Sequence, residues 1–239
     1  MTSIDYTLCD RSDRPILSIE FDGLGEGFSR DGVYVPRYTL AKDPNREWKL
    51  NFKLKVCESA WYPMFIVSFE EARQLGSELS LSVLDGIIGH CLGGLHTQER
   101  VNELADEQRE ILNNWGGDDS SLDEFVSDLI LEAEVASQMA WNPVRRKIHE
   151  FQDVLMRHEG KLSWRESTSP RALVAQASDE EPIARQVTVT TSRGEVTEEA
   201  QIRTVPDWLT ASIVADEIAQ LLAFQKAVGL FDNPLSQTA

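Results

Sequence analysis

Residues 64–71, MFIVSFEE, contain the change of periodicity that decides the fold class. The first residues are an apolar run of the kind found in a central strand of a sheet. Ser68 is then followed three residues later by Glu71, which is the spacing of a helix capping box. Strand-like patterns precede this point and helix-like patterns follow it. The sequence therefore predicts an α+β protein with an N-terminal antiparallel sheet, a helical middle segment, and a C-terminal β-hairpin followed by an amphipathic helix.

Three further segments before residue 68 have strand-like patterns. Residues 15–21 (PILSIEF) are apolar and end in a glycine-rich turn, and residues 33–40 (VYVPRYTL) contain a proline that suits an edge strand. Residues 47–56 (EWKLNFKLKV) alternate apolar with polar side chains, which predicts a strand with one buried face. The side chains expected on that buried face are Trp48, Leu50, Phe52, Leu54 and Val56.

The segment after residue 68 has helical periodicity. Helices are expected over residues 68–75, 81–92, 97–115 and about 120–141. Another helix is expected to begin after Asn142 and to end near His158, because a cap residue followed by Pro143 is a common helix start.

The C-terminal third differs in composition from the rest. Residues 159–186 are rich in Ser, Glu, Ala and Arg and contain two prolines, which favours a linker-like excursion. A β-hairpin is expected around the turn at Gly194, followed by a helix over residues 207–228 that has too many apolar side chains to stand alone. The expected organisation is a core domain over residues 1–158, a linker-like excursion over residues 159–186, and a hairpin plus helix over residues 187–239.

The composition excludes several classes of partner. The chain has 40 acidic and 23 basic residues, a formal net charge of −17, so its field repels phosphate backbones and anionic lipid surfaces. Duplex nucleic acid and membranes are therefore not expected partners. The most basic stretch, residues 46–55, holds four bases and one acid. The N-terminal residues lack the pattern of a secretion signal, and no stretch reaches the ~18 apolar residues that span a bilayer, so a cytoplasmic protein is expected.

Metal, cofactor and nucleophile motifs are weak or missing in the sequence. The three cysteines are widely spaced and odd in number, which favours reduced thiols. His90 and His96 are six residues apart, so they point to different sides of a helix and do not predict a zinc site. Phosphate-binding glycine loops and the nucleophile elbow are also missing from the sequence. No catalytic, cofactor-binding or metal-binding residue is assigned from these patterns, and no cofactor is expected.

A second set of residues resembles, in part, the three motifs of metal-dependent 3′→5′ exonucleases. Glu20 and Asp22 share one face of a strand, residues 87–90 read Ile-Ile-Gly-His, and His149 precedes Asp153. In those enzymes the motif acids hold two catalytic cations. The middle motif here lacks an acid after His90, and the order and spacing of the other two motifs differ, so the chain is not assigned to that family. Whether Glu20, Asp22, His149 and Asp153 converge on a metal is left open.

The leading functional hypothesis from the sequence is an acidic, non-catalytic protein-interaction subunit or adaptor of a larger assembly. Its partner is expected to be another protein or a second copy of the chain, because the acidic charge favours basic protein surfaces. The alternative is a metal-dependent nucleic-acid-processing enzyme, exonuclease-like, or a degenerate relative, so enzymatic activity is left undecided. The candidate partner-binding side chains are Trp164, Trp208, Leu209, Ile213 and Phe224.

Overall fold

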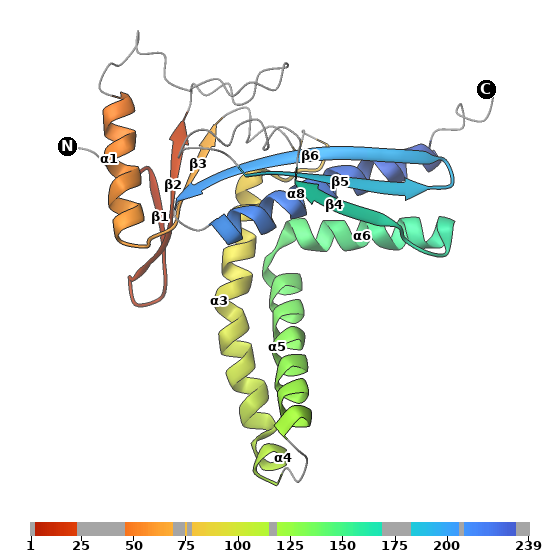
Figure 1. Ribbon diagram of the computed structural model, residues 1–239, viewed down its shortest axis with the longest axis horizontal. Helices are drawn as coiled ribbons and strands as arrows, with labels where there is room; N and C mark the ends of the chain where they lie inside the picture. The colour runs from red at the N-terminus through yellow and green to blue at the C-terminus, as the bar shows by residue number, and fades with distance from the viewer. Residues whose placement is uncertain are drawn as a thin grey trace.

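Six strands of the described residues form one sheet, in the order β1-β2-β3-β6-β5-β4 (Figure 1). The computed structural model describes residues 3–22, 46–68, 75, 78–114, 119–168, 183–205 and 208–232. The strands are β1 (Tyr6–Cys9), β2 (Pro15–Asp22), β3 (Met64–Ser68), β4 (Trp164–Thr168), β5 (Ile183–Thr191) and β6 (Gly194–Val205). The helices are α1 (Arg46–Ser59), α3 (Val83–Glu107), α4 (Arg109–Asn113), α5 (Asp119–Trp141), α6 (Pro143–Glu159) and α8 (Trp208–Asp232).

Strand β6 joins the two halves of the sheet. Its last residues pair antiparallel with β3, and the preceding residues up to Ile202 pair antiparallel with β5. Strands β1 and β4 lie at the two edges, each antiparallel to its neighbour. Strands β2 and β3 are parallel, with Ser18 opposite Met64. Two parallel strands cannot be joined by a tight hairpin, so the chain must cross over between them, and α1 lies in that crossover.

The predicted strand over residues 47–56 is wrong, because this segment is part of helix α1. The side chains expected to be buried lie outside: Trp48 is 64% exposed, Phe52 48% and Val56 51%. Successive residues of this set are four positions apart. Their spacing therefore fits one face of an alternating strand and also one stripe along a helix. The side chains of Leu50 and Leu54 lie outside the described part. With a helix here, the N-terminal strands combine one antiparallel and one parallel pair.

The two helices expected over residues 81–92 and 97–115 are a single helix, α3, followed by the short α4. The expected helices were separated at residues 93–96, but α3 continues through this stretch, Gly93 and Gly94 included. A Cβ atom at Gly93 would lie 2.6 Å from Cδ of Gln138 on α5. Glycine at this position therefore permits close packing of two helices rather than ending one of them.

The remaining sequence expectations divide into three groups. The α+β class, strands β2 and β3, helices α5, α6 and α8, and the C-terminal hairpin are confirmed. Within residues 159–186, interpreted as linker-like, the short strand β4 extends the sheet next to β5. The strand expected over residues 33–40, and residues 69–74 of the helix expected to start at Ser68, lie outside the described residues.

The main core lies between the sheet and the helices α3, α6 and α8. It combines buried apolar side chains of both halves of the sheet, such as Leu17, Phe65 and Val187, with Ile148 of α6 and Phe224 of α8. Helices α3 and α5 run side by side and extend away from the sheet as a long hairpin that ends near α4 (Figure 1). None of the helices that the structure describes combines the length and apolar character needed to cross a membrane.

The contact of α3 with the start of α6 predicts that a larger side chain at Gly89 lowers the stability of the fold. An added Cβ atom there would lie 2.8 Å from Cδ of Pro143 and 2.9 Å from the Asn142 backbone, which cannot move aside. We expect Gly89→Ala to lower the free energy of unfolding by about 1–3 kcal/mol in urea denaturation. Gly94→Ala is the matched control: no atom lies within 4 Å of its Cβ position, so alanine should stabilise the helix by about 0.5–1 kcal/mol. Equal effects of the two substitutions would contradict this packing.

Candidate functional site

Strands β2 and β3 are covered on both faces, and the two faces differ in chemistry. Leu17 and Ile19 of β2 and Phe65 of β3 point into the main core. The alternate residues point towards α1, where Met64 and Ile66 pack against Cys57 of that helix. The α1 side of β2 carries polar residues instead, beginning with Ser18. A polar strand face is thus enclosed under a helix.

Glu20 lies on this enclosed face and forms an ion pair with Lys53 of α1. Both side chains are largely buried, with 13% of Glu20 and 11% of Lys53 exposed. Lys53 contacts Oε1 of the carboxylate, whereas Oε2 is buried without a hydrogen-bond partner among the residues that the structure describes. A buried carboxylate oxygen without a partner is costly, and such groups concentrate at binding and catalytic sites. Asp22 follows two residues later at the end of the same strand, so its position is on the same strand face, and its side chain lies outside the described part. We refer to Glu20, Asp22 and Lys53 as the β2–α1 site.

Neutral hydrogen bonds surround the β2–α1 site. The Ser18 hydroxyl lies 3.0 Å from both the Thr7 hydroxyl and the Tyr62 hydroxyl. Burial raises the pKa of the Cys57 thiol, and the negative charge of Glu20 raises this pKa further. The thiol is thus held protonated, and it lies 3.8 Å from the sulfur of Met64. These contacts hold the side chains around Glu20 in place, and none of them brings a second charged group to its carboxylate.

The side chains of the β2–α1 site suit a defined chemistry. Carboxylate oxygens are the ligands that Mg²⁺ prefers in proteins, and a lysine ammonium group stabilises negative charge on a phosphoryl oxygen. Within the described ranges, no group of three or more His, Cys, Asp or Glu residues is placed to hold a metal. The later pair proposed with them, His149 and Asp153, is exposed on α6, at the opposite end of the sheet from α1 (Figure 1). These two residues therefore do not join Glu20.

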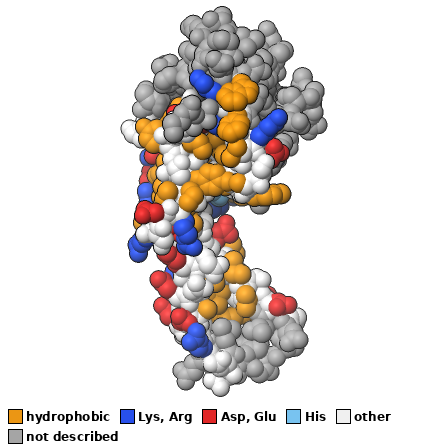
Figure 2. All heavy atoms as spheres, turned by 90° about the vertical axis from the view of Figure 1, so that its left-hand side faces the viewer, with side chains coloured by type: hydrophobic (Ala, Val, Ile, Leu, Met, Phe, Trp, Pro, Cys, Tyr) orange, Lys and Arg blue, Asp and Glu red, His pale blue; other side chains and the backbone are white. Residues whose placement is uncertain are grey.

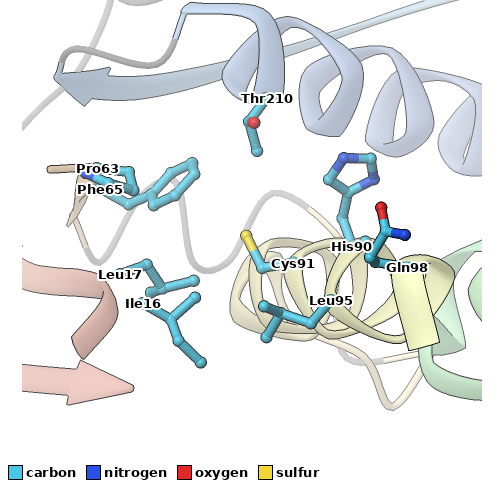
Figure 3. A pocket seen from close by; sticks show the side chains of 10 residues that line it. Ile16, Leu17, Pro63, Phe65, His90, Cys91, Leu95, Gln98 and Thr210 are labelled. Atoms are coloured by element: carbon cyan, nitrogen blue, oxygen red, sulfur yellow. The ribbon is translucent and has the colours of Figure 1, made fainter. Parts of the chain in front are cut away.

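A second cavity lies on the other face of β2 and β3, between this sheet, α3 and the start of α8 (Figure 3). Its volume is about 370 Å³. Phe65 and Leu95 contribute to an apolar lining, and His90, Cys91 and Thr210 are among the residues that add polar groups. Of the two histidines considered in the sequence, His90 lines this cavity together with Cys91, and their side chains point in different directions from α3 (Figure 3). His96 lines a separate pocket with Glu99 and Trp141.

His90 belongs to a buried polar network at the base of the helical hairpin. Its Nδ1 atom lies 3.5 Å from Oε1 of Glu217, an α8 residue that is 4% exposed. Asn142 donates a hydrogen bond of 2.8 Å to Oε2 of Glu217, and Nε of Arg145 lies 3.8 Å from Oε1. Gln138 donates to the His90 carbonyl oxygen at 3.1 Å. Because these contacts connect α3, α5, α6 and α8, the network positions helices against each other, and we assign it a structural role.

The preceding residue of α8, Asp216, is partly buried close to a cation. Burial raises the pKa of this carboxyl group to about 6, although Arg185 of β5, 3.5 Å away, acts in the opposite direction. Asp216 and Glu217 are two acids inside an otherwise apolar stretch of sequence. That pattern is the signal in the sequence for a buried polar contact.

The candidate partner-binding residues lie in different environments. Phe224 is completely buried in the main core, and Ile213 is half-buried. Trp164 is 43% exposed, and its ring meets Phe224 edge-on with ring centroids 5.7 Å apart. The side chains of Trp208 and Leu209 lie outside the described part. Helix α8 therefore docks on the sheet of its own chain, and Phe224 is not accessible to a partner.

Comparisons of this chain with protein-family models, with curated proteins and with solved structures find no match. The function must therefore be argued from the geometry of the chain itself. On that basis the β2–α1 site is the strongest candidate, because it combines a buried, incompletely satisfied carboxylate with a lysine from a different element. Lys53 was missed as a site residue, since the expected strand placed it on the solvated face. The basic stretch over residues 46–55 was the signal that could have identified it.

Proposed function

We propose that the protein processes nucleic acids as a metal-dependent phosphodiester hydrolase, and that the reaction takes place at the β2–α1 site. The observation that carries this proposal is the buried Glu20 carboxylate, which shares one oxygen with Lys53 and leaves the other without a partner. An incoming divalent cation would supply the missing partner. Cys9, Cys57 and Cys91 form no disulfide in the part of the chain that the structure describes, which suits the reducing, Mg²⁺-containing cytoplasm in which we place the activity.

Each residue of the site has a distinct role in this proposal. Glu20 and Asp22 would hold the cation, which would supply activation of a water molecule when bound. In the hydrolysis the water oxygen would bond to phosphorus as the bond to the leaving oxygen breaks, and the proton that the water loses would end on the leaving oxygen. Lys53 fixes the Glu20 carboxylate and places an ammonium group where negative charge develops on the phosphoryl group.

The distribution of charge supports a nucleic-acid substrate. The chain as a whole repels phosphates, with a net charge of −17, yet residues 46–55 carry four bases and one acid. Lys49, Lys53 and Lys55 all belong to α1, the helix that covers Glu20. A phosphate chain can therefore approach locally at α1 while the rest of the surface prevents general binding to duplexes.

This proposal predicts a metal-dependent cleavage activity that depends on Glu20 and Lys53. We expect a fluorescent single-stranded oligonucleotide to be cut with Mg²⁺ or Mn²⁺ and to stay intact with EDTA. Glu20→Gln should abolish cleavage, and Lys53→Met should slow it by about a hundredfold or more. Glu58→Gln, an exposed position on the same helix, should cleave like the wild type.

The melting temperature of each variant, measured by circular dichroism, separates loss of chemistry from loss of folding. Metal-independent cleavage, or a folded Glu20→Gln variant that retains full activity, would show that the β2–α1 site is not the reaction centre.

A second candidate function is an acidic protein-interaction subunit, and the α3–α5 hairpin favours it. Residues 83–141 contain thirteen acidic and two basic residues, and both bases are already paired, Arg100 with Glu103 and Arg109 with Asp106. Leu131 is 58% exposed and Val135 is 50% exposed on α5. An apolar strip within an acidic arm is suited to a basic protein with an apolar face, whereas a second copy of this acidic chain would be repelled.

The hairpin proposal is tested by removing its exposed aliphatic side chains. The double variant Leu131→Ser and Val135→Ser should keep the wild-type melting temperature, because both side chains are solvated. It should lose the co-purifying protein that the wild type retains at low salt and releases at high salt. Met156→Ser, an exposed position on α6 (43%), is the control. A partner that is retained equally by all three proteins would exclude the hairpin as its binding surface.

A further inference from the structure

Helix α1 presents two aromatic rings to solvent. Trp48 and Phe52 are 64% and 48% exposed, and their rings stack with centroids 5.7 Å apart and an interplanar angle of 18°. Val56 continues the row one turn later and is 51% exposed. The helix turns Lys53 and Cys57 towards the sheet, so this row follows a different side of the same helix. Apolar surface that is exposed in a row is unfavourable for folding, and such patches mark binding surfaces.

Positive charge accompanies these rings. Four of the ten residues from 46 to 55 are basic, in a chain where acids outnumber bases by 40 to 23. Lys55 is exposed, and Lys49 is half-buried between the aromatic row and the sheet side of the helix. On the side of the molecule that carries α1, hydrophobic side chains lie next to Lys and Arg side chains (Figure 2). We define Trp48, Phe52, Val56 and Lys55 as the α1 face.

We infer that the α1 face binds single-stranded nucleic acid, with bases stacked on Trp48 and Phe52 and the phosphates drawn to the lysines of α1. The inference rests on the proposed function, because the same helix supplies Lys53 to the β2–α1 site. The inference adds that the substrate is single-stranded, which the Glu20–Lys53 pair alone does not indicate. Aromatic rings combined with basic side chains are the two components by which proteins bind single strands without reading their sequence.

The charge of the chain distinguishes single strands from duplexes. A duplex offers mainly phosphates, because its base faces are already stacked on each other, and a net charge of −17 opposes binding through phosphates alone. A single strand also offers the faces of its bases. Two neighbouring rings can therefore contribute stacking that compensates for the unfavourable charge of the whole protein.

The experiment measures binding without catalysis. The full chain is titrated, in EDTA, into a fluorescein-labelled oligothymidylate of about 12 nucleotides, with fluorescence anisotropy as the readout. We expect the wild type to bind the single strand and to bind the duplex of the same length far more weakly. Trp48→Ala and Phe52→Ala should each weaken binding by about tenfold. Lys55→Glu should weaken it and lower its dependence on salt, because one phosphate contact is lost.

Trp61→Ala is the matched control, because Trp61 is 84% exposed but follows α1 in a turn and is not part of the stacked pair. Circular dichroism checks that each variant is folded. Equal affinity for duplex and single strand, an effect of Trp61→Ala as large as that of Trp48→Ala, or no binding at all would overturn the inference. So would sedimentation showing that Trp48→Ala converts a dimer into a monomer without changing oligonucleotide affinity, since the face would then be covered by a second copy.

The same variants, tested for both binding and cleavage, distinguish a failure of this inference from a failure of the proposed function. Binding in EDTA that depends on Trp48 and Phe52, together with no cleavage in Mg²⁺ or Mn²⁺, would support the α1 face and reject the hydrolase. Cleavage that depends on Glu20 but is unchanged in Trp48→Ala and Phe52→Ala would reject the α1 face and support the hydrolase.

Discussion

The ion pair between Lys53 and Glu20 connects the N-terminal strands to the only described helix on their outer face. Strand β2 is covered on both sides, so its polar residues cannot be fully solvated. A carboxylate buried in that position requires a nearby positive charge, and Lys53 of α1 supplies it. Once Lys53 and Cys57 face the sheet, the positions of Trp48 and Phe52 on the opposite side of the helix are determined. The enclosed acid and the exposed aromatic rings are thus two consequences of one packing arrangement.

The rest of the molecule supports this arrangement from the other face of the sheet. Strand β6 bridges the N-terminal strands to the C-terminal hairpin, and α8 packs against β5 and β6 with an almost fully buried apolar surface. The Glu217 network ties α8 to the base of the α3–α5 hairpin. Two polar systems therefore lie on opposite faces of one sheet. Within the described residues, each of the two carboxylates keeps one oxygen atom without a hydrogen-bond partner. Glu217 is held by groups from several elements and is structural, whereas Glu20 has a single charged partner, Lys53.

Periodicity predicted the fold class and most elements but failed where two structures share one pattern. Residues 47–56 alternate like a strand, yet Trp48, Phe52 and Val56 also form a helical row. The parallel pairing of β2 with β3, which needs a crossover connection, favours a helix there. Two helices were expected on either side of residues 93–96, where α3 is continuous and Gly93 allows close packing with α5. Glu20 was recognised as a candidate from its strand position. Lys53 could not be paired with it, because that contact depends on the helix the sequence did not predict.

The most direct test of the β2–α1 site is a crystal structure of the full chain grown with MnCl₂, in which anomalous scattering locates the metal. Our account predicts an anomalous peak about 2 Å from a carboxylate oxygen of Glu20, with Asp22 among its ligands. A map that shows manganese bound elsewhere, while Lys53 and Glu20 remain paired and no peak lies beside them, would contradict the account.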